Sequence, residues 1–405
     1  MIFFIGVVLF ALGIGLSVAL HEAGHMLTAK WFGMKVRRYF IGFGPKIFSF
    51  RRGETEYGLK AIPGGGFCDI AGMTAMDELT PDEEKRAMWR YPAWKRVIVM
   101  VAGSVTHFIL GFVILYILAA TMGLPNLVDK PVVASTACVQ SDTIDMDVKK
   151  PRPPCAAGDQ GPAAQAGLRA GDEIVAVNGK ETPTFTDLRT TLKPLSGPQR
   201  ITVERDGAEQ TLTVDVTVAQ RLVENKEGQR SLQAQGSIGV LRAAEFEYNA
   251  GSAIGGTISF TGDMFVKTWE GLIRFPERIP AVVRAIGGGE RDPDTPVSVV
   301  GASILGGDAV ERGLWDVVLL LLASLNFFIG VFNLLPLLPL DGGHIAVIVY
   351  EKVRNWLRRV RGKPAGGPVD YSKLMAVTMV VVFIGGAVML LTITADIVNP
   401  IRIKN

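Results

Sequence analysis

Four long apolar runs constrain the fold of this chain more than any other feature of its sequence. A helix needs about 20 apolar residues to cross roughly 30 Å of hydrocarbon. Hydrophobic residues make up 48% of the chain, and they are concentrated in these runs rather than spread evenly. The runs extend over Ile2–Leu20, Val97–Leu124, Leu314–Leu340 and Leu374–Ile393. The sequence therefore predicts an α-helical polytopic membrane protein with four transmembrane helices.

The first run could instead be a cleaved signal peptide. However, no basic segment precedes it, it is longer than the apolar region of a normal signal peptide, and it has no clear small-x-small cleavage site. We interpret it as the first span.

The placement of lysine and arginine predicts the orientation of the spans. Basic residues are dense in the segments 30–96 and 345–373, and short loops rich in such residues face the cytoplasm. The region from about Pro125 to Arg312 is then extracytoplasmic, and both termini lie outside.

The segment 30–96 is expected to contain a small β region. Three β-prone runs are separated by glycine-rich turns: Lys35–Phe40, Lys46–Arg51 and Glu56–Ile62. The charged stretch Ala71–Arg96 is expected to be partly helical near the membrane surface.

One compact domain is predicted in the outer region. The segment Pro162–Lys180 indicates a short helix, a glycine turn, a strand and an Asn-Gly hairpin turn. Thr186–Leu192 indicates a second helix, and Asp206-Gly207 joins two further strands. This stretch, with its Ala-Gly-Leu-x-x-Gly-Asp and Asn-Gly motifs, resembles a PDZ domain. That resemblance implies binding of an extended peptide at a sheet edge.

The Gly251–Gly289 segment has apolar residues at roughly helical spacing beside basic ones. It is interpreted as an amphipathic helix lying on the bilayer, with a buried helix of the outer domain as the alternative.

Three cysteines and a net charge of +3 exclude several classes of protein. So few cysteines do not build a disulfide scaffold or a cysteine-rich zinc module, and so small a charge does not indicate a nucleic acid partner. Cys138 and Cys155 both lie in the outer region, where a disulfide between them is one of two open alternatives. Cys68 is expected to be a free thiol.

The first span ends in His21-Glu22-Ala23-Gly24-His25. Residues i and i+4 share one helical face, so both imidazoles can bind one zinc ion, while Glu22 can act as the base for an attacking water. The first basic residue after this motif is Lys30, so the motif lies near the inner edge of the membrane, where ionisable groups are costly unless they are functional. The other interpretation is a capped helix end with interfacial histidines.

A catalytic zinc ion needs a third protein ligand and one open position. Asp341 is the lone carboxylate at the end of the third apolar run, in Asn333-Leu-Leu-Pro-Leu-Leu-Pro-Leu-Asp341-Gly-Gly-His344. The two prolines break the helix, which a membrane tolerates only where protein or water surrounds the backbone. The first and third spans run in the same direction, so Asp341 and His25 can meet at similar depth.

Together these features resemble the site-2 protease family of intramembrane zinc metalloproteases, and most closely its actinobacterial members with a single PDZ domain. The resemblance covers nearly the whole chain. It implies a Zn²⁺ cofactor bound by His21, His25 and Asp341, with Glu22 as the catalytic base. The expected layout is 1–29 (first helix with the zinc motif), 30–96 (cytoplasmic β region), 97–124 (second helix), 125–220 (PDZ domain), 221–313 (outer or interfacial segment), 314–344 (third helix with the third ligand), 345–373 (basic loop), 374–396 (fourth helix) and 397–405 (tail).

The resemblance also implies a substrate site. The Lys60–Phe67 hairpin, with Gly64, Gly65 and Gly66, is expected to present an edge strand to unwound substrate. Asn333 is expected either to orient a substrate carbonyl or to bond the broken helix backbone. The chain departs from the family at the second span, where Gly-Pro-x-x-Asn is usual and Gly103-Ser-Val-Thr-His107 stands instead. His107 is a polar substitute near the site or an alternative ligand, and His344 is an interfacial residue or a partner of a ligand.

The predicted function is regulated intramembrane proteolysis in the bacterial cell membrane. Expected substrates are single-span proteins of the anti-sigma factor type, already shortened by another protease. The alternative is a non-proteolytic zinc-bound membrane adaptor or sensor that uses its PDZ domain. A transporter is disfavoured because only one broken helix is evident, and a serine protease because no Gly-x-Ser-x-Gly motif occurs.

Overall fold

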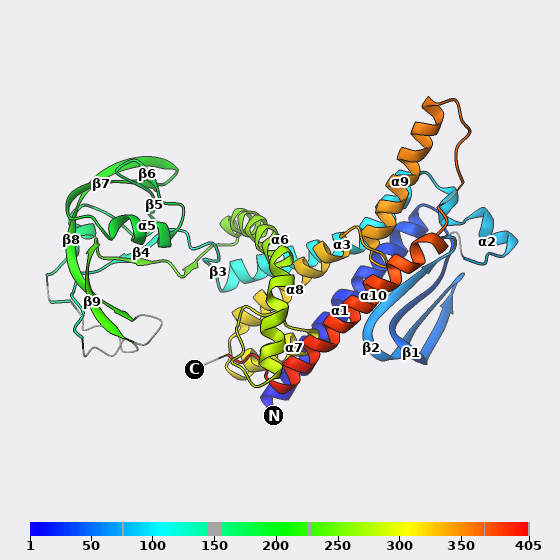
Figure 1. Ribbon diagram of the computed structural model, residues 1–405, viewed down its shortest axis with the longest axis horizontal. Helices are drawn as coiled ribbons and strands as arrows, with labels where there is room; N and C mark the ends of the chain where they lie inside the picture. The colour runs from blue at the N-terminus through cyan, green and yellow to red at the C-terminus, as the bar shows by residue number, and fades with distance from the viewer. Residues whose placement is uncertain (75–76, 145–154, 157, 225–228, 368, 404–405) are drawn as a thin grey trace. The chain divides into compact units, whose positions relative to one another are not determined.

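The computed structural model of this chain describes residues 1–74, 77–144, 155–156, 158–224, 229–367 and 369–403. These residues form two compact units. The helical unit comprises Met1–Met122 and Asn249–Asn405, and the sheet unit comprises Gly123–Tyr248 (Figure 1).

Eight α-helices and one short 3₁₀ helix are described in the helical unit. They are α1 Ile2–Trp31, α2 Pro81–Lys85, η1 Met88–Arg90, α3 Ala93–Thr121, α6 Ser252–Ile286, α7 Val299–Glu311, α8 Trp315–Asn333, α9 Asp341–Val360 and α10 Ser372–Val398. Within the described part of the chain, α1, α3, α8 and the Leu374–Val398 portion of α10 are long and apolar enough to cross a membrane. The four predicted apolar helices are therefore confirmed.

Helix packing brings distant parts of the sequence together. α1 packs against α3 and α7, and α3 packs against α8 and α9. The third apolar run is not one helix: α8 ends at Asn333, and α9 begins at Asp341 after a non-helical segment with Pro336 and Pro339. The proline-induced break is confirmed. Helix α6 belongs to the helical unit, so the alternative of a buried helix in the outer domain is wrong.

Two long strands, β1 Val36–Arg52 and β2 Thr55–Ile70, form a sheet beside α1 (Figure 1). The register shows that each strand folds back on itself. The first half of β1 pairs on one side with 56–59 and on the other with 66–70, while its second half pairs with 55–60. Gly42 and Gly44 have φ values of +87° and +80°, which let β1 bend between its halves. The segment 66–70 is consequently an edge strand of this sheet.

The sheet unit contains two short helices and nine strands in its described residues. They are α4 Gly161–Gln165, α5 Phe185–Leu192, β3 Leu124–Pro125, β4 Val133–Thr136, β5 Glu173–Val177, β6 Lys180–Glu181, β7 Gly197–Arg205, β8 Ala208–Glu224, β9 Arg230–Ser237, β10 Val240–Arg242 and β11 Glu245–Phe246. Five strands form one sheet in the order β6-β5-β7-β8-β9, and β10–β4 and β11–β3 form two further pairs. The unit continues past residue 220 to Tyr248, so β9, β10 and β11 belong to it.

Local sequence explains two turns of this unit. Asn178 and Gly179 have φ values of +53° and +82°, and Asp206 and Gly207 have values of +52° and +78°. Positive φ at both central residues is the requirement of a two-residue hairpin turn of type I′, which Asn-Gly and Asp-Gly satisfy best. A disulfide joins Cys138 to Cys155, and Cys68 is free.

Candidate metal centre

Two imidazoles of α1 meet on one helical face. The Nε2 atoms of His21 and His25 are 3.1 Å apart, as the i, i+4 spacing allows, and both side chains are buried. The Nδ1 atom of His25 lies 2.7 Å from the carbonyl oxygen of Val99. Since a carbonyl only accepts, Nδ1 of His25 must donate, and Nε2 is left with a free lone pair for a metal.

Asp341 arrives at the same point from the start of α9. Its Oδ2 atom is 3.3 Å from Nε2 of His21 and 3.3 Å from Nε2 of His25. The two following glycines make this approach possible. A Cβ atom on Gly342 would lie 2.3 Å from the backbone of Leu334, and one on Gly343 would lie 2.5 Å from the backbone nitrogen of Leu338. The chain can therefore turn tightly from the broken segment into α9 only without side chains here.

The geometry of these three atoms fits a zinc ion. Ligands at about 2.0–2.1 Å from a tetrahedral zinc are roughly 3.3 Å from one another, and the observed separations are 3.1 to 3.3 Å. Oδ2 of Asp341 is buried and has no hydrogen-bond partner, so hydrogen bonding does not explain its position. Among the described residues, the group holds three possible ligands and no fourth side chain of a ligand type, which leaves one coordination position open.

Glu22 lies between this centre and the edge strand of the β1–β2 sheet. A Cβ atom on Gly66 would lie 3.0 Å from Cγ of Glu22, and the backbone of Cys68 donates a hydrogen bond to the Glu22 carboxylate. The sheet is also joined to α1 because the Tyr39 hydroxyl donates to the carbonyl oxygen of Ala19 at 2.7 Å. Burial, and next the nearby Glu22 charge, raise the pKa of the Cys68 thiol, so this cysteine remains protonated and is a poor nucleophile.

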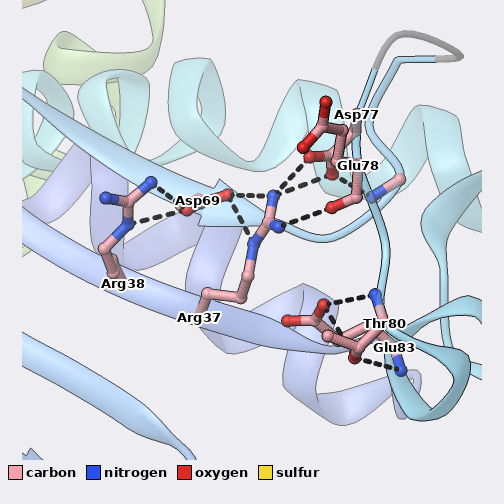
Figure 2. A network of polar contacts seen from close by, with 8 residues as sticks. Arg37, Arg38, Asp69, Asp77, Glu78, Thr80 and Glu83 are labelled. Carbon is pink, nitrogen blue, oxygen red and sulfur yellow. Dashed lines mark hydrogen bonds and ion pairs between the residues drawn. The ribbon is translucent and has the colours of Figure 1, made fainter.

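An ion-pair network holds the far end of the edge strand in place (Figure 2). Asp69 accepts hydrogen bonds from Arg37 and Arg38, and Arg37 also binds Asp77 at 2.7 Å. The second carboxylate oxygen of Asp77 accepts the backbone N–H of Gly72 at 2.7 Å. Arg37 of β1 is therefore bonded both to Asp69 in the edge strand and to Asp77 in the loop after β2.

Two glycines allow α1 and α3 to pack closely at the centre. A Cβ atom on Gly103 would lie 2.4 Å from Nε2 of His25 and 2.5 Å from Cε1 of His21. A Cβ atom on Gly24 would lie 2.7 Å from the carbonyl oxygen of Ala102. Gly103 thus provides the space that the two imidazoles occupy.

A second buried polar pair adjoins the centre. Nδ1 of His107 lies 2.8 Å from Oδ1 of Asn326, and both side chains are buried. The amide nitrogen of Asn326 donates to Leu322, so its Oδ1 accepts and His107 must donate from Nδ1. The His107 ring packs against the His21 ring with centroids 5.0 Å apart. Sequence reasoning missed Asn326, although a lone amide inside an apolar run is itself a pointer to a buried partner.

The structure brings together only some of the predicted site residues. His21, His25, Asp341 and Glu22 converge, and Gly66 adjoins Glu22. A Cβ atom on Gly65 would meet the Phe43 ring and one on Gly64 would meet Ile62, so these two glycines contact the turn of the sheet instead. Asn333 is half-buried at the end of α8, and within the described part of the chain it is not among the three residues of the centre. His344 stacks on Tyr371, with Nδ1 3.3 Å from the Tyr371 hydroxyl.

Fold and site define a class: a protein with several candidate membrane spans, a His-His-Asp group that could hold a metal ion, and an adjacent glutamate. The family model for "Peptidase family M50" matches residues 9–377, and the chain belongs to this family, which is the site-2 protease family. It is 48% identical over 408 residues to "Zinc metalloprotease Rip1" of Mycobacterium bovis and 49% identical over 412 residues to the protein of that name in Mycolicibacterium smegmatis, with 100% of each chain covered. It is 32% identical to "Putative zinc metalloprotease mll0638" of Mesorhizobium japonicum, covering 83% of this chain and 86% of that protein.

The predicted family, enzyme class and cofactor are thus confirmed. The chain is a zinc metalloendopeptidase of the intramembrane, site-2 protease type, and Zn²⁺ is its cofactor.

Proposed function

We propose that this protease hydrolyses peptide bonds in the transmembrane segments of single-span membrane proteins, with His21, His25 and Asp341 as zinc ligands and Glu22 as general base. One observation carries the assignment: three ligand atoms lie 3.1 to 3.3 Å apart, and the glutamate next to them faces an edge strand.

The chemistry divides between the cofactor and the side chains. Zinc bound by the three residues supplies a Lewis acid that polarises the scissile carbonyl and acidifies the attacking water. Glu22 accepts the proton of that water and later delivers it to the leaving amine. The Val99 carbonyl keeps the His25 ring in the tautomer whose Nε2 is free.

The edge strand 66–70 is proposed to hold the substrate in extended form. A helical substrate hides its own amides, so it must be unwound before its backbone can be attacked. Backbone pairing with an edge strand stabilises an unwound peptide without reading its sequence. The position of Gly66 beside Glu22 supports this role for Gly66. Gly64 and Gly65 act indirectly in this scheme by shaping the preceding turn, and Asn333 by its position at the end of α8, where the helix breaks.

The sheet unit is proposed to be a single PDZ domain that docks a peptide or filters substrates by size. A cavity of about 620 Å³ lies along α5 and the segment 236–241. Leu188 and Leu192 of α5 line it together with Ile238, and Arg189 adds positive charge. Apolar walls with a nearby cation suit an extended peptide with an apolar side chain and a free carboxylate.

The protein is proposed to lie in the bacterial cytoplasmic membrane with both termini outside. The clusters of basic residues in 30–96 and 345–373 support a cytoplasmic position for these segments, which puts the metal centre toward the cytoplasmic face. Proposed substrates are anti-sigma factor proteins that another protease has already shortened. No nucleic acid takes part.

Exchange of Glu22 for glutamine tests the catalytic assignment. Glu22→Gln keeps the size of the side chain but removes the base, so we expect the purified variant to retain zinc and to lose at least about 100-fold in cleavage rate. Cleavage is measured on a tagged single-span reporter in membranes, and zinc by elemental analysis. Glu290→Gln, an exposed change on the loop after α6, is the matched control and should cleave normally. Unchanged cleavage by Glu22→Gln would exclude Glu22 as the base.

A further inference from the structure

A second cavity, in addition to the one in the sheet unit, lies at the C-terminal end of α1 and apart from the metal centre. It measures about 360 Å³, and its lining consists of Lys30, Phe50, Arg52, Gly53 and Tyr57. Lys30 belongs to the last turn of α1, and the other four residues belong to the turn between β1 and β2 and its flanks. This cavity therefore forms where a membrane span meets the β1–β2 sheet.

The lining is rich in hydrogen-bond donors and poor in acceptors. The Lys30 ammonium donates to the Tyr57 hydroxyl at 2.6 Å, which leaves two of its N–H groups and the Tyr57 O–H available. The Arg52 guanidinium has five N–H donors, and none of them bonds to a side chain of the described residues. Within the described ranges, no carboxylate lies at ion-pair distance from Lys30 or Arg52. A site of this kind favours an anion with several acceptor oxygens.

Several neighbouring cations of the same region are already paired with carboxylates. Lys35 and Arg86 share Glu54, Lys46 binds Glu56, and the two arginines of Figure 2 bind Asp69. The Arg86–Glu54 pair, with Lys35, lowers the pKa of Glu54 to about 2, so this carboxylate is fully charged and fully engaged. Lys30 and Arg52, by contrast, have no carboxylate partner among the described residues, and both line one cavity.

The position of the cavity indicates the source of the anion. Lys30 is the second-last residue of a candidate span, and the next residue, Trp31, is 80% exposed. Phe50 stacks on the Tyr57 ring at 5.4 Å and is itself 50% exposed. Basic and aromatic side chains in this arrangement are typical of the level of lipid headgroups, with apolar surface available for the adjoining acyl chains.

We propose that this cavity binds the phosphate group of an anionic phospholipid, with Lys30 and Arg52 as its cationic contacts and the Tyr57 hydroxyl as a further donor. The bound lipid joins the end of α1 to the β1–β2 turn. The same sheet carries the edge strand beside Glu22, so a lipid held here fixes the sheet at the membrane surface.

The test is native mass spectrometry of the zinc-loaded full-length protein titrated with phosphatidylglycerol. Each neutralised cation should weaken binding about 5-fold, and Lys30→Gln combined with Arg52→Gln should weaken it roughly 25-fold, since a basic residue near an anionic lipid surface contributes a factor of that size. Phosphatidylcholine should bind far more weakly than phosphatidylglycerol. Glycerol 3-phosphate, which offers the phosphate without acyl chains, should not compete at equal concentration.

Arg51→Gln is the matched control, because successive side chains of a strand point to opposite faces. It makes the same charge change one residue away and should alter binding less than 2-fold. Equal losses in Arg51→Gln and Arg52→Gln would overturn the proposal, as would unchanged binding by the double variant. Full competition by glycerol 3-phosphate would mean that the cavity binds a soluble phosphate compound rather than a lipid. If the double variant loses zinc or does not fold, lipid binding by Arg52→Gln alone is measured instead, because Arg52 lies at an exposed turn. Unchanged binding by this single variant would then overturn the proposal.

Discussion

The helical unit exposes far more large apolar side chains than the sheet unit does, and it buries a group of histidines. The core of the sheet unit is aliphatic, with Ile174, Leu188 and Val203 fully buried. In the helical unit, the polar residues His21, His25, His107 and Asn326 are buried, while large apolar side chains such as Phe4 and Phe383 are 70% and 71% exposed. A surface in contact with lipid can expose apolar residues that a surface in water must bury, so the exposed apolar helices agree with candidate membrane spans.

The difference teaches how to interpret a buried polar residue in this chain. In the sheet unit, Asp172 is buried but makes two hydrogen bonds of 2.7 Å with Arg205. Burial alone would raise the pKa of Asp172, yet these bonds hold it below its usual range, so the pair is a structural ion pair. In the helical unit, Asp341 makes no hydrogen bond through Oδ2 and faces two imidazoles instead. A buried carboxylate without a hydrogen-bond or ion-pair partner of opposite charge therefore indicates a functional site in this chain.

The largest effect is expected from a methyl group placed at the metal centre. Gly103→Ala would put a carbon 2.4 Å from Nε2 of His25, so the imidazoles must move apart. We expect zinc content of the purified protein to fall at least about 10-fold while hydrogen exchange in the sheet unit stays unchanged. Gly385→Ala, which has open space in the α10 span, should retain zinc. Normal zinc binding by Gly103→Ala would contradict the close packing of α1 and α3.

The next largest effect is expected from a change in the apolar core of the sheet unit. Leu188 is fully buried in the sheet unit, and Leu188→Ala should destabilise this unit by about 2–5 kcal/mol through lost apolar contacts and a residual cavity. Hydrogen exchange of peptides from 123–248 measures this change, and zinc content should remain that of the unaltered protein. Leu232→Ala, at a side chain that is 40% exposed, should change stability by less than about 0.5 kcal/mol. Loss of zinc in Leu188→Ala alone would show that the two units are not independent.

The smallest effect concerns the polar pair beside the metal centre. Asn326→Leu removes the acceptor that orients His107, whose ring packs on His21, and we expect zinc affinity to fall about 10-fold. Competition with a chelator measures this affinity. Ser104→Ala is the control and should leave the zinc affinity unchanged. Ser104 lies on α3, as His107 does, and its buried hydroxyl has no hydrogen-bond partner among the described residues. An equal affinity of Asn326→Leu and the unaltered protein would mean that His107 does not position His21.

The sequence was sufficient to predict the four apolar spans and to propose all three zinc ligands. Apolar runs are local in sequence, and the His-x-x-x-His spacing defines a helical face without knowledge of the rest of the fold. Asp341 could be predicted because two prolines and two glycines mark a break beside the carboxylate at the end of its run. The hairpin turns of the sheet unit followed from Asn-Gly and Asp-Gly for the same local reason.

Contacts between distant helices could not be predicted in this way. The pairing of His107 with Asn326 depends on which faces of α3 and α8 meet, and the spacing within either helix does not determine it. The same is true of Gly103, whose role depends on the imidazoles of α1. The double folding of β1 and β2 also decides that Gly66, rather than Gly64 or Gly65, approaches Glu22.

The metal centre joins α1 at the start of the chain to Asp341 at the start of α9. During synthesis, roughly 300 residues separate the emergence of the histidines from that of Asp341, which at 5–20 residues per second corresponds to roughly 15 to 60 s. Throughout this interval the nascent polypeptide resides in the membrane with an incomplete ligand set. The three proposed ligands are therefore present together only late in translation, once Asp341 has emerged.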